Sequence, residues 1–292
     1  MSKLGIIGGS GLYHLPEVAG GDVVAIETPF GAPSTPPRIG RVGETDVVFI
    51  ARHGGGHVFS PTTLPYRANI YALKALGVEQ VVSVSAVGSL RAGLPPRSVV
   101  LPDQIIDRTV ARERTFFDDG VVAHVGLADP FCPVLRHSVA DVAEATGTAI
   151  EEGGTYVCIE GPQFSTRAES RLYRSWDATV IGMTAMPEAR LAREAELCYA
   201  TIALVTDYDV WHEAEAEVSV ELVLGHLRAN VVVAGALIRG LAVRGLPDRI
   251  CGCKDALRDA VMTAPAEITA AQRARLGVVG AERVGAEDAG PA

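Results

Sequence analysis

Two carboxylates directly follow one strongly apolar stretch of the chain. Residues 199–206 read YATIALVT, and Asp207, Tyr208 and Asp209 come next. We interpret the stretch as a buried strand that presents both acids at its end. Burial raises a carboxyl pKa and lets the group donate a proton. Adenine has an acceptor at N7 and a donor at N6, which one protonated and one ionised carboxyl group would match. A solvated acidic loop or a helix N-cap is the alternative.

Two glycine-containing loops offer hydroxyl and backbone donors to an anion. The segment GGSG at residues 8–11 lets the backbone approach closely, and Ser10 adds a hydroxyl group. The segment SAVGS at residues 85–89 places Ser85 and Ala86 at the end of another apolar run. Each segment alone is equally compatible with a tight or polar turn, and the glycine spacing of the first is not GxGxxG.

A third loop, ARHGGGH at residues 51–57, carries a cation. An arginine at a strand end beside three glycines fits a bidentate phosphate clamp, so Arg52 is a candidate for that role. His53 and His57 could donate to phosphate or sugar oxygens. A surface arginine in a flexible loop is the alternative.

The elements that must position these residues alternate between strand and helix. Apolar runs predict strands, and apolar residues at helical spacing predict helices. The expected strands are 3–7, 23–27, 46–51, 80–87, 98–101, 155–159, 179–182 and 199–206, and the expected helices are 66–76, 130–146, 188–196, 218–243 and one from residue 167. This order predicts an α/β fold with a mixed, largely parallel central β-sheet flanked by helices, in which ligand groups gather beyond the carboxyl ends of the strands.

The length of 292 residues and the 48% hydrophobic content suit a domain with a substantial core. We expect one domain over residues 1–250, a segment at 251–263 and a mobile, Ala- and Gly-rich tail at 264–292. A net charge of −9 opposes nonspecific binding to nucleic acid or an anionic membrane. We see neither a secretory signal nor an uninterrupted apolar run long enough to span a bilayer, and we expect a cytoplasmic protein.

The five cysteines do not predict a disulfide framework. Their number is odd, and Cys251 and Cys253 form a lone CxC motif. Two thiolates make half of a zinc site, and no second pair follows in the sequence. A local redox pair or two idle thiols are the more favoured interpretations.

Nine ordered segments resemble the trimeric purine nucleoside phosphorylase family, and within it the 5′-methylthioadenosine phosphorylases. The similar segments, over roughly residues 3–245, are GIIGGSGL, ARHGGGH, YRANIYALKALG, SAVGSLR, HVGLADPFCP, IEGPQFSTRAES, GMTAMPEA, LAREAELCYA and TDYDVW. The resemblance implies a single-domain phosphorylase fold and a homotrimer with sites at subunit interfaces. It also implies inorganic phosphate as co-substrate, with no metal and no organic cofactor.

The resemblance assigns roles to particular residues of this chain. The phosphate-binding positions are Ser10, Arg52, His53, Ser85, Ala86 and Thr184. The positions that contact sugar and base are Phe164, Met183, His57, Asp207 and Asp209, with His124 donated by a neighbouring subunit. The pocket for the 5′ substituent involves Val220, Val223 and Leu224. Gly182 is a departure, because animal-type members commonly have Asn before Met-Thr.

The acidic loop predicts the purine that is bound. Relatives that accept 6-oxopurines carry Asn in this loop, whereas TDYDVW resembles the adenine-type sequence. The expected reaction is phosphorolysis of 5′-methylthioadenosine to adenine and 5-methylthioribose 1-phosphate, with Asp207 protonating N7 and Asp209 holding N6. The alternatives are a phosphorylase for inosine, guanosine or methylthioinosine, a hydrolytic nucleosidase and, from GIIGGSG, a dinucleotide-binding regulator.

Overall fold

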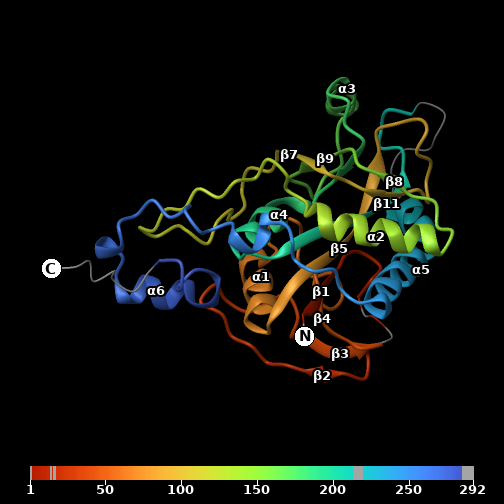
Figure 1. Ribbon diagram of the computed structural model, residues 1–292. Helices are drawn as coiled ribbons and strands as arrows, with labels where there is room; N and C mark the ends of the chain where they lie inside the picture. Colours follow the sequence, from red (N-terminus) through yellow and green to blue (C-terminus); the bar gives the residue numbers. More distant parts are fainter. Residues whose placement is uncertain (1, 14, 16–17, 213–219, 285–292) are drawn as a thin grey trace.

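Strands and helices alternate along most of the chain, and the expected α/β fold is confirmed (Figure 1). A computed structural model describes residues 2–13, 15, 18–212 and 220–284, and the side chains of residues 220–224 and 228 are not described. The strands are β1 Lys3–Gly8, β2 Asp22–Val23, β3 Arg38–Val42, β4 Thr45–Ala51, β5 Val78–Ser89, β6 Val99–Leu101, β7 Gln104–Arg108, β8 Glu151–Glu152, β9 Thr155–Ile159, β10 Val180–Gly182 and β11 Cys198–Asp207.

The strands form one mixed sheet. The main order is β2-β3-β4-β1-β5-β10-β9-β7, and β11 pairs with β5 and β6 outside that path. The neighbours β4, β1, β5 and β11 are parallel, while β10 runs antiparallel to β5 and parallel to β9. The parallel strands therefore bring their carboxyl ends to the same edge, where the candidate loops begin.

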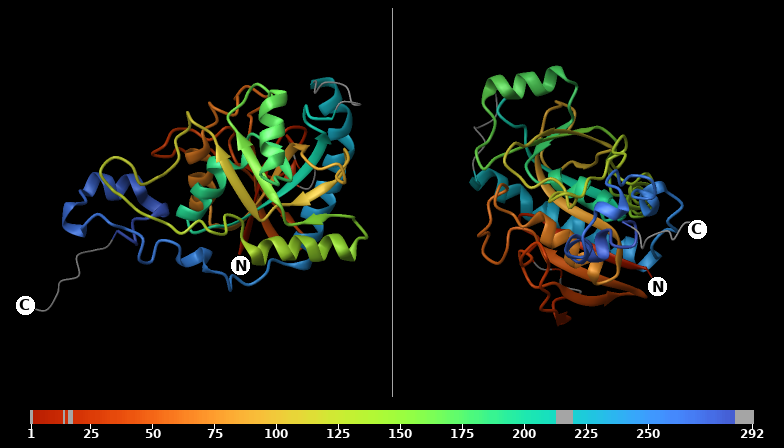
Figure 2. Two further views of the ribbon diagram at one scale, coloured as in Figure 1. Left: turned by 90° about the horizontal axis from the view of Figure 1, so that it is seen from above. Right: turned by 90° about the vertical axis from the view of Figure 1, so that its left-hand side faces the viewer.

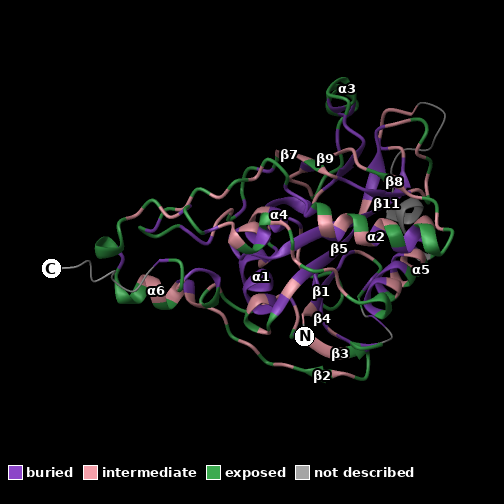
Figure 3. Cartoon of the chain, viewed as in Figure 1, coloured by how far each residue is buried: buried purple, intermediate pink, exposed green. Residues whose placement is uncertain are grey.

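Helices cover both faces of the sheet. The helices are α1 Tyr66–Ala75, α2 Pro133–Ala145, α3 Arg167–Ser175, α4 Ala185–Glu194, α5 Val220–Arg244 and α6 Ala270–Leu276. Side chains of α1 and α4 belong to one apolar cluster, and those of α2 and α5 belong to the other. Strand β4 alternates between the two, since Val48 and Ile50 face the first cluster while Val47 and Phe49 face the second. The central strands β1, β4, β5 and β11 lie buried between the two clusters, while outer strands such as β2 and β3 are more exposed (Figure 3).

Helix α5 packs one side against the apolar cluster that it shares with α2, and residues such as Val232 and Val243 on its other side are exposed. Residues 225–244 are long and apolar enough to cross a bilayer by length and composition alone. Leu237, Ile238 and Leu241 are buried in the cluster that α5 shares with α2 and with β11. We therefore interpret α5 as a core helix of the α/β domain.

The described part of the tail that was predicted to be mobile at residues 264–292 is folded. Residues 264–284 form short helices, and Ile268, Leu276 and Val279 are buried in the cluster that includes α1. This part of the chain runs beside residues 109–130, where Ala123 forms a β-bridge with Val261. Together, residues 109–130 and 251–284 form an arm that extends away from the sheet (Figures 1 and 2). Capping and a few apolar contacts order a segment whose composition indicated mobility. Residues 285–292 lie outside the described residues.

Candidate active site

A cavity of about 480 Å³ opens at the carboxyl ends of β1, β4, β5, β10 and β11. Eleven of the predicted site residues line it: Ser10, Arg52, His53, His57, Ser85, Ala86, Phe164, Met183, Thr184, Asp207 and Asp209. They come from strands and loops that are far apart in the sequence. The sheet topology therefore assembles one pocket from the segments that the sequence analysis had treated separately.

Asp207 is the last residue of β11 and is buried. One of its oxygens, Oδ2, accepts a hydrogen bond from the Thr206 hydroxyl at 2.7 Å, and the other accepts the backbone N–H of Asp209 at 2.8 Å. Burial raises the pKa of Asp207, although these two hydrogen bonds act in the opposite direction. The carboxyl group is thus held in one orientation and binds a proton more readily than a carboxyl group in water.

Asp209 is also buried, and its backbone is left-handed, with φ of 55°. Burial raises its pKa to about 6; the nearby Ser170 side chain acts in the opposite direction, and the negative charge of Asp207 adds to the rise. Its Oδ2 atom has no hydrogen-bond partner among the described residues. A strained backbone and an unsatisfied buried acceptor are costly features that cluster at functional sites. A ligand that donates a hydrogen bond to the Asp209 Oδ2 atom would account for both features.

Hydroxyl groups gather on another side of the cavity. Ser85 on β5 and Thr184 after β10 lie 3.1 Å apart between their oxygen atoms, and both are buried. Ser10 follows β1, where a Cβ atom on Gly9 would lie 2.2 Å from the carbonyl oxygen of Val84. Only glycine allows that approach of the loop to β5. The hydroxyl groups make a neutral cradle that can donate to an oxyanion.

Arg52 lines the cavity but does not present a free guanidinium fork. Its Nε and Nη2 atoms donate to the two carboxylate oxygens of Glu188, each at 2.9 Å, and both side chains are 1% exposed. Nη2 also donates to Ser83, and Nη1 donates to the Val84 carbonyl at 2.9 Å. Four of the five guanidinium N–H groups are thus used. The predicted bidentate clamp is corrected to at most one donor, because an internal carboxylate occupies the fork.

The rings of His53 and His57 are stacked, with their centroids 4.1 Å apart. Burial and the neighbouring Arg52 charge lower the pKa of His53 to about 4, so its ring is neutral at pH 7. His53 Nδ1 lies 2.9 Å from the Phe59 carbonyl, which can only accept, so Nδ1 carries the hydrogen. The other ring nitrogen is then an acceptor. It suits a protonated phosphate oxygen and differs from the donor role predicted for His53.

Apolar side chains form the rest of the wall. Val87, Ile181, Met183, Phe164 and Leu227 line the cavity between the carboxylates and the hydroxyl groups. A flat, mostly apolar base fits such a wall, while the few polar groups fix its orientation.

Gly182 leaves room for a buried tyrosine. A Cβ atom on Gly182 would lie 1.9 Å from the Tyr156 hydroxyl oxygen and 2.6 Å from Cζ of the same ring. The two residues come from the parallel neighbours β10 and β9. The departure from the family pattern at Gly182 therefore has a steric cause in this chain.

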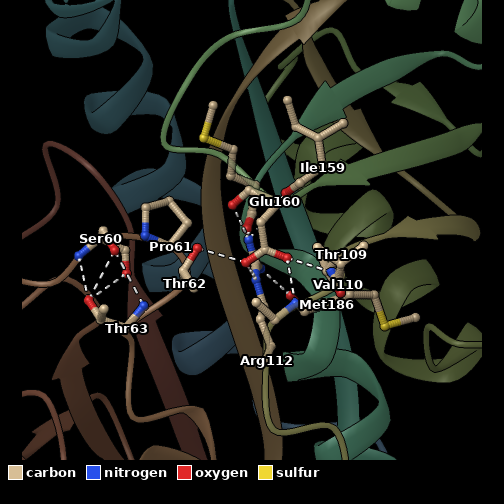
Figure 4. Close-up of polar contacts among 12 residues, drawn as sticks. Ser60, Pro61, Thr62, Thr63, Thr109, Val110, Arg112, Ile159, Glu160 and Met186 are labelled. Atoms are coloured by element: carbon tan, nitrogen blue, oxygen red, sulfur yellow. Dashed lines mark hydrogen bonds and ion pairs between the residues drawn. The ribbon is translucent and has the colours of Figure 1, made fainter.

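The sequence did not indicate the residues that fix the positions of the cavity-lining side chains. Arg112 donates to the carbonyl oxygens of Met183 and Met186, each at 2.6 Å, and to Glu160 (Figure 4). Partial burial of Glu160 favours its neutral form. Hydrogen bonds from Thr62 and from backbone N–H groups, together with the charge of Arg112, outweigh this effect and lower the pKa of Glu160 to about 2. Arg112 thus fixes the loop that carries Met183. Neither Arg112 nor Glu188 lies in a pattern that indicates such a role.

Of the four remaining predicted residues, only His124 has a described side chain. His124 is exposed on the arm, where its backbone N–H donates to the Ala260 carbonyl, and it is not among the described lining residues. Val220, Val223 and Leu224 belong to the start of α5, and their side chains lie outside the described residues.

The chain is similar to known proteins over nearly its whole length. Residues 3–242 match the model of the phosphorylase superfamily. The S-methyl-5′-thioadenosine phosphorylase of Geobacter sulfurreducens is 50% identical over 277 residues, which cover 94% of this chain and 97% of the relative. The enzyme of the same name from Cereibacter sphaeroides is 52% identical and covers 91% of this chain and 93% of its own.

Comparison with solved structures also finds methylthioadenosine phosphorylases. A methylthioadenosine phosphorylase from an antarctic soil metagenomic library matches with a TM-score of 0.87 at 46% identity, over 95% of this chain and 98% of that one. The Schistosoma mansoni methylthioadenosine phosphorylase in complex with adenine matches with a TM-score of 0.80 at 37% identity, over 84% of this chain and 91% of that one. By its sequence and its fold, this chain belongs to the phosphorylase superfamily.

Proposed function

We infer that this protein catalyses the phosphorolysis of 5′-methylthioadenosine to adenine and 5-methylthioribose 1-phosphate. The observation that carries the inference is the pair of buried carboxyl groups, Asp207 and Asp209, in the same cavity as the Ser85 and Thr184 hydroxyl groups. The carboxyl pair suits a 6-aminopurine, and the two hydroxyl groups suit an oxyanion. Relatives about 50% identical over most of the chain carry the name of this activity.

Asp207 and Asp209 act on the leaving base in this proposal. Cleavage of the bond between C1′ and N9 moves negative charge into the purine. Asp207, whose pKa is raised by burial, transfers its proton to N7, so adenine leaves as a neutral molecule. The unpartnered Oδ2 atom of Asp209 accepts the hydrogen bond from the N6 amino group.

Phosphate attacks C1′ from the face opposite the base. Ser10, Ser85, Thr184 and the backbone of Ala86 donate to its oxygens, and Arg52 adds one N–H group. The Arg52–Glu188 pair is close to neutral as a unit, so it orients the phosphate more than it neutralises it. The dianionic charge of phosphate remains to stabilise the positive charge that develops on the sugar.

The remaining roles concern the sugar and its 5′ substituent. Met183, Phe164 and His57 contact the ribose and base from the apolar wall, and Val220, Val223 and Leu224 surround the methylthio group. His124 comes from a neighbouring chain of a homotrimer. Catalysis needs neither a metal nor an organic cofactor in this cavity, and the protein works in the cytoplasm.

Selectivity for the base tests this assignment. We expect kcat/KM for 5′-methylthioadenosine to exceed that for inosine by roughly tenfold or more, because O6 facing the Asp209 carboxylate leaves a buried acceptor unpaired at about 1–3 kcal/mol. Adenosine serves as the matched 6-amino control. Faster phosphorolysis of inosine than of adenosine would contradict the roles of Asp207 and Asp209.

A further inference from the structure

Four of the five cysteines converge in the folded chain. Cys132, Cys198, Cys251 and Cys253 place their sulfur atoms within 4.8 Å of one another. None of them is bonded to another cysteine. Only the Cys251–Cys253 pair is visible as a sequence motif, because Cys132 and Cys198 lie 53 or more positions before Cys251.

We propose that these four cysteines bind one Zn²⁺ ion in a structural, tetrahedral site. This inference goes beyond the proposed function and departs from the absence of a metal that the family resemblance implied. Four sulfur ligands are typical of structural zinc sites. A Zn–S distance of about 2.3 Å in a tetrahedron gives sulfur–sulfur separations of about 3.8 Å. The Cys251 sulfur lies 3.5 Å from that of Cys132 and 3.4 Å from that of Cys198.

The four ligands come from three separate parts of the fold. Cys132 is the N-cap of α2, and Cys198 is the first residue of β11. Cys251 precedes the short helix Gly252–Asp255, which contains Cys253. The Cys132 N–H donates to the Tyr199 carbonyl at 2.7 Å, which fixes α2 to β11. The fold therefore brings the sulfur atoms together without help from a metal, as a preorganised site requires.

The surroundings suit a negatively charged metal–thiolate centre. Cys132, Cys198 and Cys253 are buried, while Cys251 is partly accessible and gives an entry path. The Leu135 N–H donates to the Cys132 sulfur at 3.5 Å, a contact that supports a thiolate. The charge of Arg249 acts on Cys198 and Cys251, and that of Arg193 acts on Cys253. These cations offset the two net negative charges of Zn²⁺ bound to four thiolates.

The site is structural because it lies far from the cavity. Cys198 and Asp207 stand at opposite ends of β11, nine residues or about 30 Å apart. The described residues that line the cavity include none of the four cysteines. The ion would join the segment after α5 to α2 and β11, and so anchor the beginning of the C-terminal half of the arm.

Metal analysis of the full-length protein tests the proposal. Protein produced in zinc-supplemented cells and dialysed is expected to contain one zinc per chain by elemental mass spectrometry. After removal of the metal with a chelator under reducing conditions, added Co²⁺ should give the thiolate-to-cobalt absorption bands of a tetrahedral site. Cys251→Ser and Cys253→Ser should each lose most of the bound zinc. Cys158→Ala, at the buried fifth cysteine outside the cluster, should retain it.

The competing states of the four thiols have different signatures. Intact mass under nonreducing conditions and alkylation after unfolding count free thiols and disulfides in the wild-type protein. Substoichiometric zinc with disulfides among these four residues would overturn the proposal, as would four free thiols that bind neither Zn²⁺ nor Co²⁺. Because wild-type protein gives these readouts, the result does not depend on whether a variant folds or on catalytic activity.

Discussion

In the proposed reaction, the chemistry depends on the carboxyl groups of Asp207 and Asp209. Their burial at the end of β11 disfavours the ionised forms, so the pair retains a proton at a higher pH than two acids in water. Interacting acids titrate as a unit, which gives the pair one protonated and one ionised member over a range of pH. That combination is the complement of N7 and N6 of adenine.

Asp207→Asn removes the proposed general acid without changing the size of the side chain. We expect kcat for 5′-methylthioadenosine to fall by roughly a hundredfold or more, the usual contribution of general acid catalysis. Asp177→Asn is a matched control, because Asp177 is 92% exposed and distant from the cavity lining. Steady-state assays on both variants, with circular dichroism to verify folding, check this prediction. A wild-type kcat in Asp207→Asn would remove the acid role.

If Asp209 holds N6 as proposed, binding of the base depends on pH. Its pKa of about 6 lies above the ordinary value of an aspartate, so the carboxylate takes up a proton as the pH falls through about 6. The charged acceptor for N6 is then lost, and the KM for 5′-methylthioadenosine should rise below that pH. In Asp209→Asn this acidic limb should be absent. Asparagine tolerates the left-handed backbone at this position.

Phosphate itself titrates in a neighbouring pH range and must be separated from this effect. The nucleoside KM is therefore measured at saturating phosphate, and the two proteins are compared at each pH. If the KM for 5′-methylthioadenosine rises at low pH in the same way for the wild-type protein and Asp209→Asn, the rise is caused by another titrating group.

At the scale of elements, α4 and β4 depend on the buried Arg52–Glu188 pair. Glu188→Ala leaves the Arg52 charge buried without its partner, so we expect the free energy of unfolding to fall by about 3–5 kcal/mol. Glu144→Ala, at an exposed position on α2, should change it by about 0.5 kcal/mol or less. Thermal or denaturant unfolding of the three proteins measures the difference. Equal stabilities for the two variants would show that the pair does not hold these elements together.

The strands and helices were largely predictable from the sequence, but the contacts between side chains far apart in the chain were not. Apolar runs that end at Ser85 and Asp207 indicated buried strands, and the structure places both residues in the cavity. Glu188 bonds to an arginine 136 positions away, a distance over which periodicity carries no information. The four-cysteine cluster was missed for the same reason. The folded tail was missed because the packing of a few apolar residues, such as Ile268, overrode a composition typical of mobile segments.

At the scale of the whole molecule, the arm carries a predicted site residue away from the cavity of its own chain. His124 is exposed there, and we predict that it acts in a neighbouring chain of the proposed homotrimer. If the active sites are shared, coexpressed His124→Ala and Asp207→Asn chains should form mixed trimers in which some sites are intact. Their activity should exceed the sum of the two separate variants severalfold.

The assembly itself is measured alongside this experiment. Light scattering should give three times the chain mass of 30.6 kDa. Activity equal to the sum of the separate variants, despite demonstrated mixing, would place His124 outside the active site.

The most direct test of the account is the phosphate dependence of adenine release from 5′-methylthioadenosine by the purified protein. We predict no turnover after removal of phosphate, and formation of adenine and 5-methylthioribose 1-phosphate in equal amounts when phosphate is restored. Release of adenine at the same rate without phosphate, with free 5-methylthioribose as the second product, would contradict phosphorolysis and identify a hydrolase.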